Sequence, residues 1–447
     1  MTPKKILFAN VPADGHFNPL TTLAIHLLEQ GHDVRWYTGK DYSDRIKKMG
    51  IRFYPCIKAL DFTQENINEL FPERNAIRSQ VAKLKYDMKH VFILRSTEYF
   101  EDIKDIQRSF DFDLMIADVA FTAIPFVRHK LQKPVIAIGV FPLTESSVDL
   151  APNGLGMTPL NTFAGRLKQR VLRYFTDAFI FRESKQLVDS LYRKYDMKAL
   201  NENLFSLLCK EATLLLQSGT PGFEYYRSDL GKNIRFIGPL LPAKKQVQPL
   251  SFADKLKHFK HVVLVTQGTV EKDPAKIIVP TLEAFKNDPS VLVIATTGGS
   301  KTQELRQQYS QPNFIIEDFI PFDAVMPHTD VYVTNGGYGG VMLGIKNQIP
   351  MVVAGVHEGK NEICARVGYF NLGVNLKTET PAPKQVYNAV LEALYNPIYQ
   401  QSVDRLQNEF NQYKPLELTD QYILEALQLE NKQAVPKKYA LFELEAA

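Results

Sequence analysis

The sequence lacks several features that would place it among specialised classes of protein. Its three cysteines, Cys56, Cys209 and Cys364, lie far apart and form no C-x-x-C pair, which argues against a zinc site or a disulfide framework and fits a reducing compartment. No apolar run is long enough to span a bilayer, and Asp14 interrupts the first apolar segment before it reaches the length of a signal peptide. The net charge of +4 is spread without a dense Lys/Arg block, so a nucleic-acid partner is not expected. These absences predict a cytoplasmic chain with no integral membrane segment.

The alternation of apolar strands with amphipathic helices predicts an α/β protein. A length of 447 residues favours two domains. The expected strands are Lys5–Val11, Asp33–Thr38, Leu114–Ala117 and Val135–Val140, and then His261–Thr266, Val291–Thr296, Phe314–Glu317, Val331–Thr334 and Met351–Ala354. The expected helices include Pro19–Gln30, Ala275–Asn287 and a last amphipathic helix near 420–433. Because βαβ units build parallel sheets covered by helices, the pattern predicts two doubly wound domains facing a cleft.

The domain boundaries follow from composition. A Pro-containing stretch, 238–242, separates the two α/β series, so we expect an N-terminal domain at 1–240, a linker at 241–255 and a second domain at 256–415. The segment 416–447 is expected to supply a helix that packs back on the N-terminal domain. Two insertions, 61–99 and 144–162, either line a substrate site or elaborate the surface. Phe62 and Phe71 in the first insertion are candidates for an apolar acceptor pocket.

A glycine-rich run is the strongest local signal. Asn335-Gly336-Gly337-Tyr338-Gly339-Gly340 follows an apolar strand and precedes a helix-permissive segment. Glycines let backbone N–H groups approach an anion, and the helix N-terminus adds positive potential. The run is neither a Walker A loop nor a G-x-G-x-x-G fingerprint, and a simple tight turn remains the alternative.

Two titratable residues follow neighbouring strands of the first half. His16 comes after the first strand, beside Gly15 and before Pro19, which is expected to start a helix. Asp118 ends another strand, so its carboxylate could orient the imidazole of His16 and stabilise its cation. The alternatives are a structural histidine and an aspartate that only caps a helix.

A metal site is not expected. Asp111-Phe112-Asp113 matches a D-x-D pattern, but it opens a strand at the end away from the cleft, and its two carboxylates alternate between sheet faces. His357-Glu358 lacks the second histidine of H-E-x-x-H.

Further candidates follow strands of the second half. Gly268 and Thr269 could offer an N–H and a hydroxyl to a phosphate. Phe319 could stack on a base, or it could pack in the core. The stretch 356–362, which includes Glu358, gathers polar groups after the next strand.

The motifs together resemble the family 1 glycosyltransferases, the GT-B group with two Rossmann-like domains that uses UDP-sugars. The likeness is carried by 15–19, 141–144, 151–156 and 334–372, and it is greatest to bacterial macrolide and natural-product enzymes. The resemblance implies that His16 is the general base and Asp118 its acidic partner. It implies that the donor is held by Gly15, Gly268, Thr269, Phe319, Ile320, Asn335, Gly336, Gly337, Tyr338, Gly339, Gly340 and Glu358.

Some positions depart from the family pattern. Asn335 stands in place of the usual histidine, and Gly339 and Gly340 replace the later Asn and Ser. Leu343 stands where an acid usually binds the ribose, and Gly359-Lys360 replaces the usual Asp-Gln pair that grips the sugar. Glucose is therefore only the default sugar.

The resemblance implies an inverting, metal-independent transfer of a hexose from a UDP-sugar to a hydroxyl of a small lipophilic acceptor, such as a phenolic, flavonoid or polyketide. No cofactor is expected beyond the UDP-sugar as co-substrate. A UDP-sugar 2-epimerase of the same fold and a non-catalytic nucleotide-sugar-binding protein are the alternatives. The sequence leaves the acceptor, the sugar and the oligomeric state open.

Overall fold

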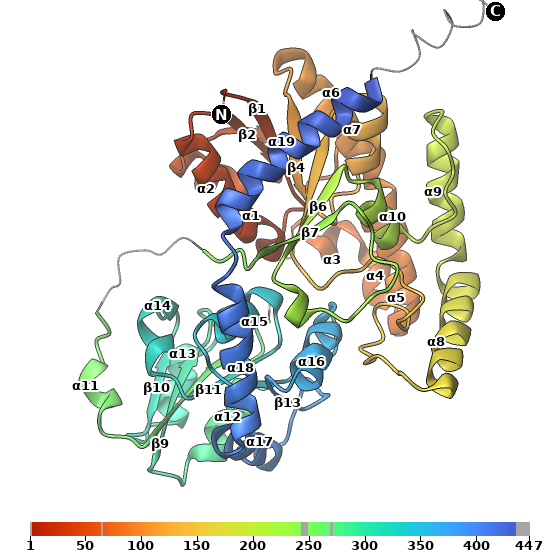
Figure 1. The fold of residues 1–447 in the computed structure, drawn as a ribbon. Coiled ribbons are helices and arrows are strands. Elements are labelled where there is room, and N and C mark those ends of the chain that lie inside the picture. Colours follow the sequence, from red (N-terminus) through yellow and green to blue (C-terminus); the bar gives the residue numbers. More distant parts are fainter. Residues whose placement is uncertain (1, 64–65, 243–248, 269–270, 435–447) are drawn as a thin grey trace, which may run out of the picture.

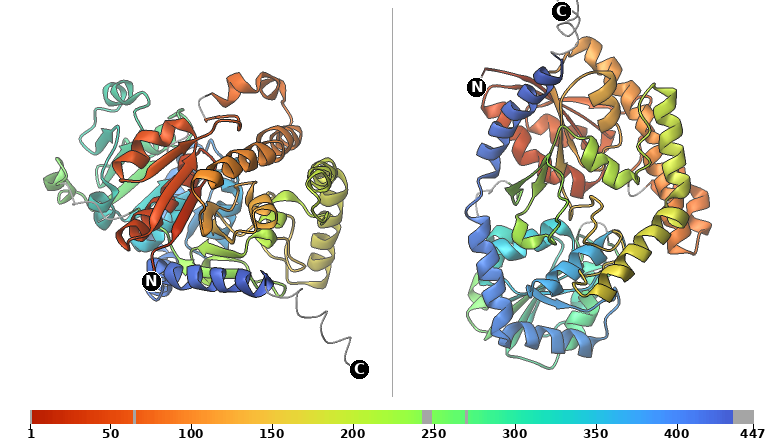
Figure 2. Two further views of the ribbon diagram at one scale, coloured as in Figure 1. Left: turned by 90° about the horizontal axis from the view of Figure 1, so that it is seen from above. Right: turned by 45° about the vertical axis from the view of Figure 1, so that its right-hand side comes forward.

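Two parallel sheets with helices on both faces form the body of the protein (Figures 1 and 2). The computed structural model describes residues 2–63, 66–242, 249–268 and 271–434. The first sheet has the order β3 (Arg52–Pro55), β2 (Asp33–Thr38), β1 (Lys5–Ala9), β4 (Leu114–Asp118), β5 (Val135–Gly139), β6 (Leu214–Ser218) and β7 (Ile234–Gly238). The second has the order β10 (Phe314–Glu317), β9 (Val291–Thr296), β8 (His261–Thr266), β11 (Val331–Thr334), β12 (Met351–Val353) and β13 (Gly373–Asn375).

Alternating burial explains why these segments form central strands. In β1, Ile6 and Phe8 belong to one apolar cluster while Leu7 and Ala9 belong to another, and all four side chains are fully buried. Successive side chains of a strand point to opposite faces, so a strand that is covered on both sides is apolar throughout. The β2, β8, β9, β10 and β11 bounds match the expected strands, whereas β3, β6, β7 and β13 were not anticipated.

Each sheet changes its direction of winding once. In the first sheet the chain moves outward from β1 to β3 and then returns to place β4 on the other side of β1. In the second sheet β11 lies beside β8 in the same way. Loops that leave neighbouring strands in opposite directions open a crevice at such a switch point, which is where ligands bind in these folds.

The helices complete the two layers around each sheet. They are α1 (Asp14–Glu29), α2 (Ser43–Lys48), α3 (Ile67–Leu70), α4 (Pro72–Ala76), α5 (Gln80–Asp87), α6 (Arg95–Ser109), α7 (Ile124–Lys130), α8 (Phe163–Phe175), α9 (Arg182–Lys194), α10 (Leu204–Glu211), α11 (Ala253–Leu256), α12 (Ile278–Phe285), α13 (Thr302–Gln308), α14 (Phe322–Val325), α15 (Tyr338–Lys346), α16 (Lys360–Tyr369), α17 (Pro383–Tyr395), α18 (Pro397–Phe410) and α19 (Pro415–Ala434). Short helical segments are η1 (Lys40–Tyr42), η2 (Met88–Ile93), η3 (Thr176–Ile180), η4 (Pro221–Phe223) and η5 (Met326–His328).

The first helix begins earlier than the sequence predicts. Pro19 was expected at its start, but α1 begins at Asp14 and Pro19 lies inside it. The backbone carbonyl of Ala13 accepts the N–H groups of His16 and Phe17, which starts the helix. Pro19 only removes the N–H that would reach Gly15 in the first turns. His16 therefore lies in the first turn of a helix and not in a loop.

The C-terminal helix α19 runs along the N-terminal sheet. It contacts β5, β6, β7 and α1 (Figure 1). Its Asp420 Oδ2 lies 2.9 Å from His26 Nε2, and Arg235 donates to Glu425 at 2.8 Å. No helix in the described ranges has both the length and the apolar character that crossing a membrane requires.

Candidate active site

His16 and Asp118 meet at the switch point of the N-terminal sheet. Nδ1 of His16 lies 2.7 Å from Oδ1 of Asp118. The aspartate is fully buried, while the histidine side chain keeps 23% of its surface exposed. The pairing follows from topology, because β1 and β4 are neighbours and both residues leave the same end of these strands.

The surroundings of Asp118 fix the state of the histidine. Besides His16, the carboxylate accepts the N–H of Val11 at 2.8 Å and that of Ala120 at 2.9 Å. A carboxylate only accepts hydrogen bonds, so its contact with a neutral imidazole at 2.7 Å forms when the proton lies on Nδ1. Nε2 of His16 is then left with its lone pair. Phe141 meets the imidazole edge-on at a ring distance of 6.0 Å.

The glycine-rich loop lies at the switch point of the second sheet, where β11 pairs with β8. β11 ends at Thr334 and α15 starts at Tyr338, so Asn335, Gly336 and Gly337 make the turn, while Gly339 and Gly340 lie in the first helical turn. Gly336 has φ +77°, and a Cβ atom there would overlap with the sulfur of Cys364. Only glycine meets both conditions without strain. Strand, glycine turn and helix start thus occur in the predicted order, which is the arrangement that accepts anions.

The side chain of Asn335 is engaged within the protein. Its Nδ2 donates to the carbonyl of Gln267, and its Oδ1 accepts the N–H of Gly337 at 3.3 Å. It therefore ties the loop after β8 to the loop after β11. Gly268, with φ +76°, lies against Asn335, whereas Thr269 lies outside the described residues.

The side chain of Tyr338 faces the other sheet. Its hydroxyl donates to the carbonyl of Ser218 at 2.5 Å and accepts from Nε2 of Gln217 at 3.3 Å. Burial raises the pKa of this phenol, so it stays neutral. The ring therefore bridges the end of β6 and the start of α15, and a contact of the Tyr338 backbone with the donor stays a prediction.

Gln217 connects the two switch points. Its side chain also donates to the carbonyl of Phe141 at 2.8 Å, and Phe141 is the ring beside His16. Helices α1 and α15, which carry His16 and the glycine turn, contact each other. The candidate base and the candidate anion site therefore belong to one connected region. Gln217 was not anticipated, since β6 itself was not.

Phe319 and Ile320 have opposite environments. Phe319 is 77% exposed, which excludes the core-packing alternative. Ile320 is buried in an apolar cluster with Val325 and Leu292. The exposed ring lies two residues after the end of β10 and is free to stack on a planar group.

The segment that follows β12 turns through two left-handed residues. Glu358 has φ +56° and Gly359 has φ +76°, and α16 begins at Lys360. The ammonium of Lys360 donates to Glu358 at 2.7 Å, and the glutamate side chain is 60% exposed. Glu358 is thus solvent-facing and ion-paired, while the first turn of α16 stands next to it.

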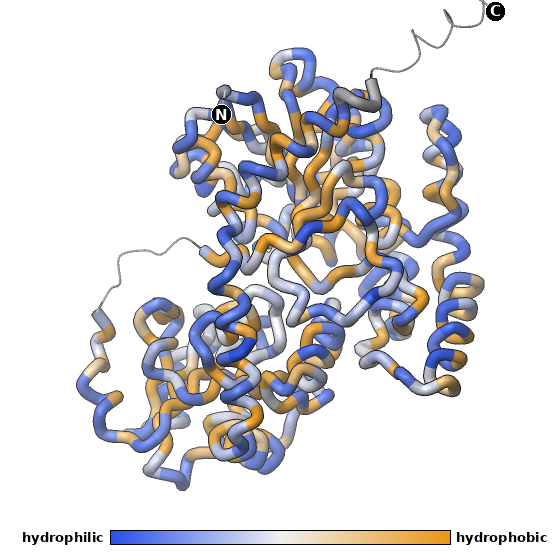
Figure 3. The backbone as a smooth tube through the Cα atoms, in the orientation of Figure 1, coloured by the Kyte–Doolittle hydropathy of each residue, from blue (hydrophilic) through white to orange (hydrophobic). Residues whose placement is uncertain are grey.

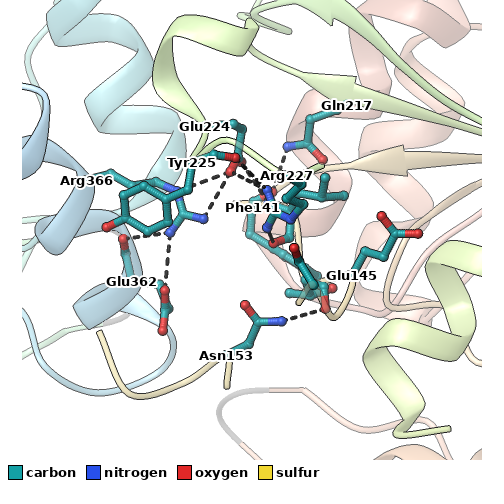
Figure 4. A network of polar contacts seen from close by, with 12 residues as sticks. Phe141, Glu145, Asn153, Gln217, Glu224, Tyr225, Arg227, Glu362 and Arg366 are labelled. Atoms are coloured by element: carbon teal, nitrogen blue, oxygen red, sulfur yellow. Dashed lines mark hydrogen bonds and ion pairs between the residues drawn. The ribbon is translucent and has the colours of Figure 1, made fainter. Parts of the chain in front are cut away.

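A buried polar network crosses between the two sheets, and sequence reasoning missed it (Figure 4). Arg366 on α16 donates to Glu224 at 3.0 Å, and Arg227 lies 3.6 Å from the same carboxylate. Arg366 also lies over the ring of Tyr225, 4.2 Å from its centre. Two arginines and two glutamates balance each other there, which buried charges require. The pair at 224 and 227 is far in sequence from the pair at 362 and 366, so no local signal shows that the two pairs meet.

The second glutamate of the network holds a loop from the other domain. Oε1 of Glu362 accepts the N–H groups of Gly154 and Gly156, each at 2.8 Å, and its Oε2 pairs with Arg366 at 3.2 Å. Asn361 donates to the carbonyl of Gly154 at 2.6 Å. The 151–156 segment of the N-terminal half is therefore anchored on the first turn of α16, close after Glu358.

Two aromatic rings of the first insertion are buried near the site. Phe62 and Phe71 are buried in a small cluster with Val11, Val91 and Ala120. Val11 and Ala120 are the residues whose N–H groups hold Asp118. The two rings therefore support the wall behind the aspartate and do not offer the broad pocket surface that the sequence suggested.

The D-x-D carboxylates have protein partners. Asp111 pairs with Lys133 at 2.7 Å, and Asp113 accepts the N–H of Lys5 at 2.8 Å, both at the start of β4. Among the described residues there is no group of three or more His, Cys, Asp or Glu side chains arranged to hold a metal ion.

Comparison with solved structures gives the class of fold. The chain superimposes on the calicheamicin glycosyltransferase CalG4 with a TM-score of 0.74 at 18% identity, over 96% of this chain and 99% of that one. The glycosyltransferase of kitacinnamycin gives a TM-score of 0.70 at 18% identity, over 95% of this chain and 99% of that one. The architecture is therefore GT-B, as the sequence predicted.

Sequence comparison gives the family. A model described as UDP-glucoronosyl and UDP-glucosyl transferase matches residues 133–424. The 4'-demethylrebeccamycin synthase of Lentzea aerocolonigenes is 32% identical over 91% of this chain and 95% of that protein. UDP-glucosyltransferase 1 of Beauveria bassiana is 30% identical over 94% of this chain and 95% of that protein. The chain belongs to this family and is a UDP-dependent glycosyltransferase.

Proposed function

We propose that the enzyme transfers a hexose, with glucose as the default, from a UDP-sugar to a hydroxyl of a small lipophilic natural product, with inversion and without a metal ion. The observation that carries this is the His16–Asp118 pair, which leaves Nε2 of a partly exposed imidazole as a base at the switch point of the first sheet. The acceptor class is supported by a relative named 4'-demethylrebeccamycin synthase, and glucose as the default sugar by one named UDP-glucosyltransferase 1.

The proposed step is a single displacement. Nε2 of His16 takes the proton of the acceptor hydroxyl as its oxygen forms a bond to the anomeric carbon. The bond from that carbon to the UDP oxygen breaks on the opposite face, and the electron pair leaves with UDP. Asp118 stabilises the imidazolium, and the N–H groups at the start of α15 meet the charge that develops on the leaving diphosphate.

The donor site is proposed to use backbone groups and one ring. Gly268 and the loop from Asn335 to Gly340 would hold the pyrophosphate, and Phe319 would stack on uracil with Ile320 offering backbone contacts. Gly15 lies in the first turn of α1, which contacts α15, and is proposed to approach the same donor. Glu358 is proposed to reach the sugar hydroxyls, since it is exposed beside the first turn of α16.

Product analysis tests the proposal. The protein is incubated with UDP-glucose, other UDP-sugars and a panel of phenols, flavonoids and polyketides, and products are identified by mass spectrometry. We expect a glycoside whose anomeric configuration, read by NMR, is opposite to that of the donor. Retained configuration, or epimerised UDP-sugar without transfer, would contradict it.

Metal dependence is tested in the same assay. Because Asp111 and Asp113 are paired at the far end of β4, we expect activity to survive prolonged EDTA treatment. Loss of activity that magnesium or manganese restores would overturn this part of the proposal.

A further inference from the structure

Helix α8 carries an apolar stripe on its outer side. Phe163 is 87% exposed, Tyr174 69%, Phe175 53%, Leu167 50% and Val171 44%. At about 100° per residue these five side chains fall within an arc of about 120°. Phe179, which is 63% exposed and stacked on Phe175, continues the stripe into η3. Figure 3 shows hydrophobic and hydrophilic residues alternating along this helix.

The opposite side of α8 packs on the protein. Gly165 and Gln169 are buried, and the amide of Gln169 bonds to Leu160 and to Asp149. Arg173 donates to the carbonyl of Leu150. The orientation of α8 is therefore fixed by contacts with the 149–160 loop, which directs the apolar stripe away from the body. In Figures 1 and 2, α8 and α9 stand at one edge of the molecule.

Positive charges border the stripe. The helix contains Arg166, Lys168, Arg170 and Arg173 and no acidic residue. Lys168 falls on one side of the stripe, and Arg166 and Arg170 fall on the other. Asp177 in η3 pairs with Lys185, which offsets its charge. An apolar stripe rich in aromatic rings and bordered by Lys and Arg is typical of helices that lie in a membrane surface.

We propose that α8 and η3 bind the surface of a bilayer that contains anionic lipids, with the stripe in the headgroup region and the three solvent-facing basic residues against lipid phosphates. A second copy of the chain fits less well, because a two-fold contact would bring the same basic residues of both copies together. A single small acceptor is too short to cover a helix of about 20 Å.

Vesicle binding tests this. The full chain is mixed with sonicated vesicles of phosphatidylcholine alone or with phosphatidylglycerol, and the bound fraction is measured by flotation at low and high salt. We expect binding only with phosphatidylglycerol, weakened by salt. Replacing Arg166, Lys168 and Arg170 together by Gln should lower the partition coefficient ~100-fold. Each basic residue near an anionic surface raises the coefficient by roughly tenfold or less, and three are removed.

Matched variants separate the alternatives. Phe163→Ser with Phe175→Ser should abolish binding, and both side chains are exposed, so glycosyl transfer in the absence of lipid should stay unchanged. Replacing Lys47, Lys48 and Lys232 by Gln removes the same charge elsewhere and should leave binding intact. No binding by the wild type, or equal loss in this control, would overturn the proposal. So would a concentration-dependent dimer, seen by analytical ultracentrifugation and lost in the Phe163/Phe175 variant.

Discussion

The two switch points of this protein present different kinds of chemistry. At the first, between β1 and β4, side chains face the crevice: an imidazole held by a buried carboxylate. At the second, between β8 and β11, glycines leave only backbone N–H groups, and the nearest side chain, that of Asn335, is engaged in holding the loops. A group that moves a proton must be a titratable side chain, whereas an anion can be held by main-chain donors. We therefore expect catalysis at the first switch point and anion binding at the second.

The largest loss of activity is expected at the switch point between β1 and β4. His16→Ala should lower kcat by ~10²–10⁴-fold, the usual share of a general base, while UDP binding changes little. Steady-state kinetics on an acceptor hydroxyl of ordinary acidity and calorimetry with UDP measure the two quantities.

Asp118 provides the control for that effect. Asp118→Asn places an amide where three donors converge, so the imidazole loses its fixed tautomer, and kcat should fall by ~10²–10⁴-fold. The double variant should be no slower than the slower single variant. Additive losses would show that the two residues do not act as one unit.

Substitutions at the adjacent positions Phe319 and Ile320 should separate an effect on UDP affinity from an effect on stability. Phe319→Ala should weaken UDP by roughly 5–150-fold, from about 1–3 kcal/mol per stacked base, with no change in Tm. Ile320→Ala should instead lower the free energy of unfolding by about 2–5 kcal/mol, since the side chain is buried. A loss of stability in the Phe319 variant would contradict its assignment to the ligand.

A substitution at Gly336 tests whether the glycine turn after β11 requires a positive φ and the absence of a Cβ atom. Gly336→Ala should destabilise the protein by about 1–3 kcal/mol, because φ is positive and the new Cβ meets Cys364. In the double variant Gly336→Ala/Cys364→Ala, the smaller side chain at position 364 should remove the clash, while the strain of the positive φ remains. Gly339→Ala is the control: no atom lies within 4 Å of its Cβ position, so thermal denaturation should show no loss, whatever happens to UDP affinity.

The smallest expected change is in the exchange of backbone amides of the 151–156 loop, which Glu362 ties to α16. Glu362→Ala removes the acceptor of the Gly154 and Gly156 N–H groups, so amide exchange in 151–156 should quicken by ~10-fold, from about 1.5 kcal/mol per charge-assisted bond. Hydrogen-exchange mass spectrometry measures this. Glu358→Ala, in a glutamate that is 60% exposed and bonded to Lys360, should leave those peptides unchanged.

The strands and glycine turns could be predicted because their causes are local. β2 and β8–β11 follow from short apolar runs, and the Asn335–Gly337 turn follows from glycines between a strand and a helix. The start of α1 could not, because Pro19 is tolerated inside the helix once Ala13 has accepted its first bonds. β6 and β7 were missed, and with them the role of Gln217.

The amino-acid sequence by itself determined the two α/β halves, the residues available at the carboxyl ends of β1, β4 and β11, and the family likeness, because these depend on periodicity and short motifs. Only the tertiary structure decided which of these groups meet. It turned the ring of Tyr338 toward Ser218, buried Arg366 against Glu224, and left the stripe on α8 uncovered. The physical reason is that such contacts join residues far apart in the chain, and the free energy of burying a charge or a ring depends on partners that no local window contains.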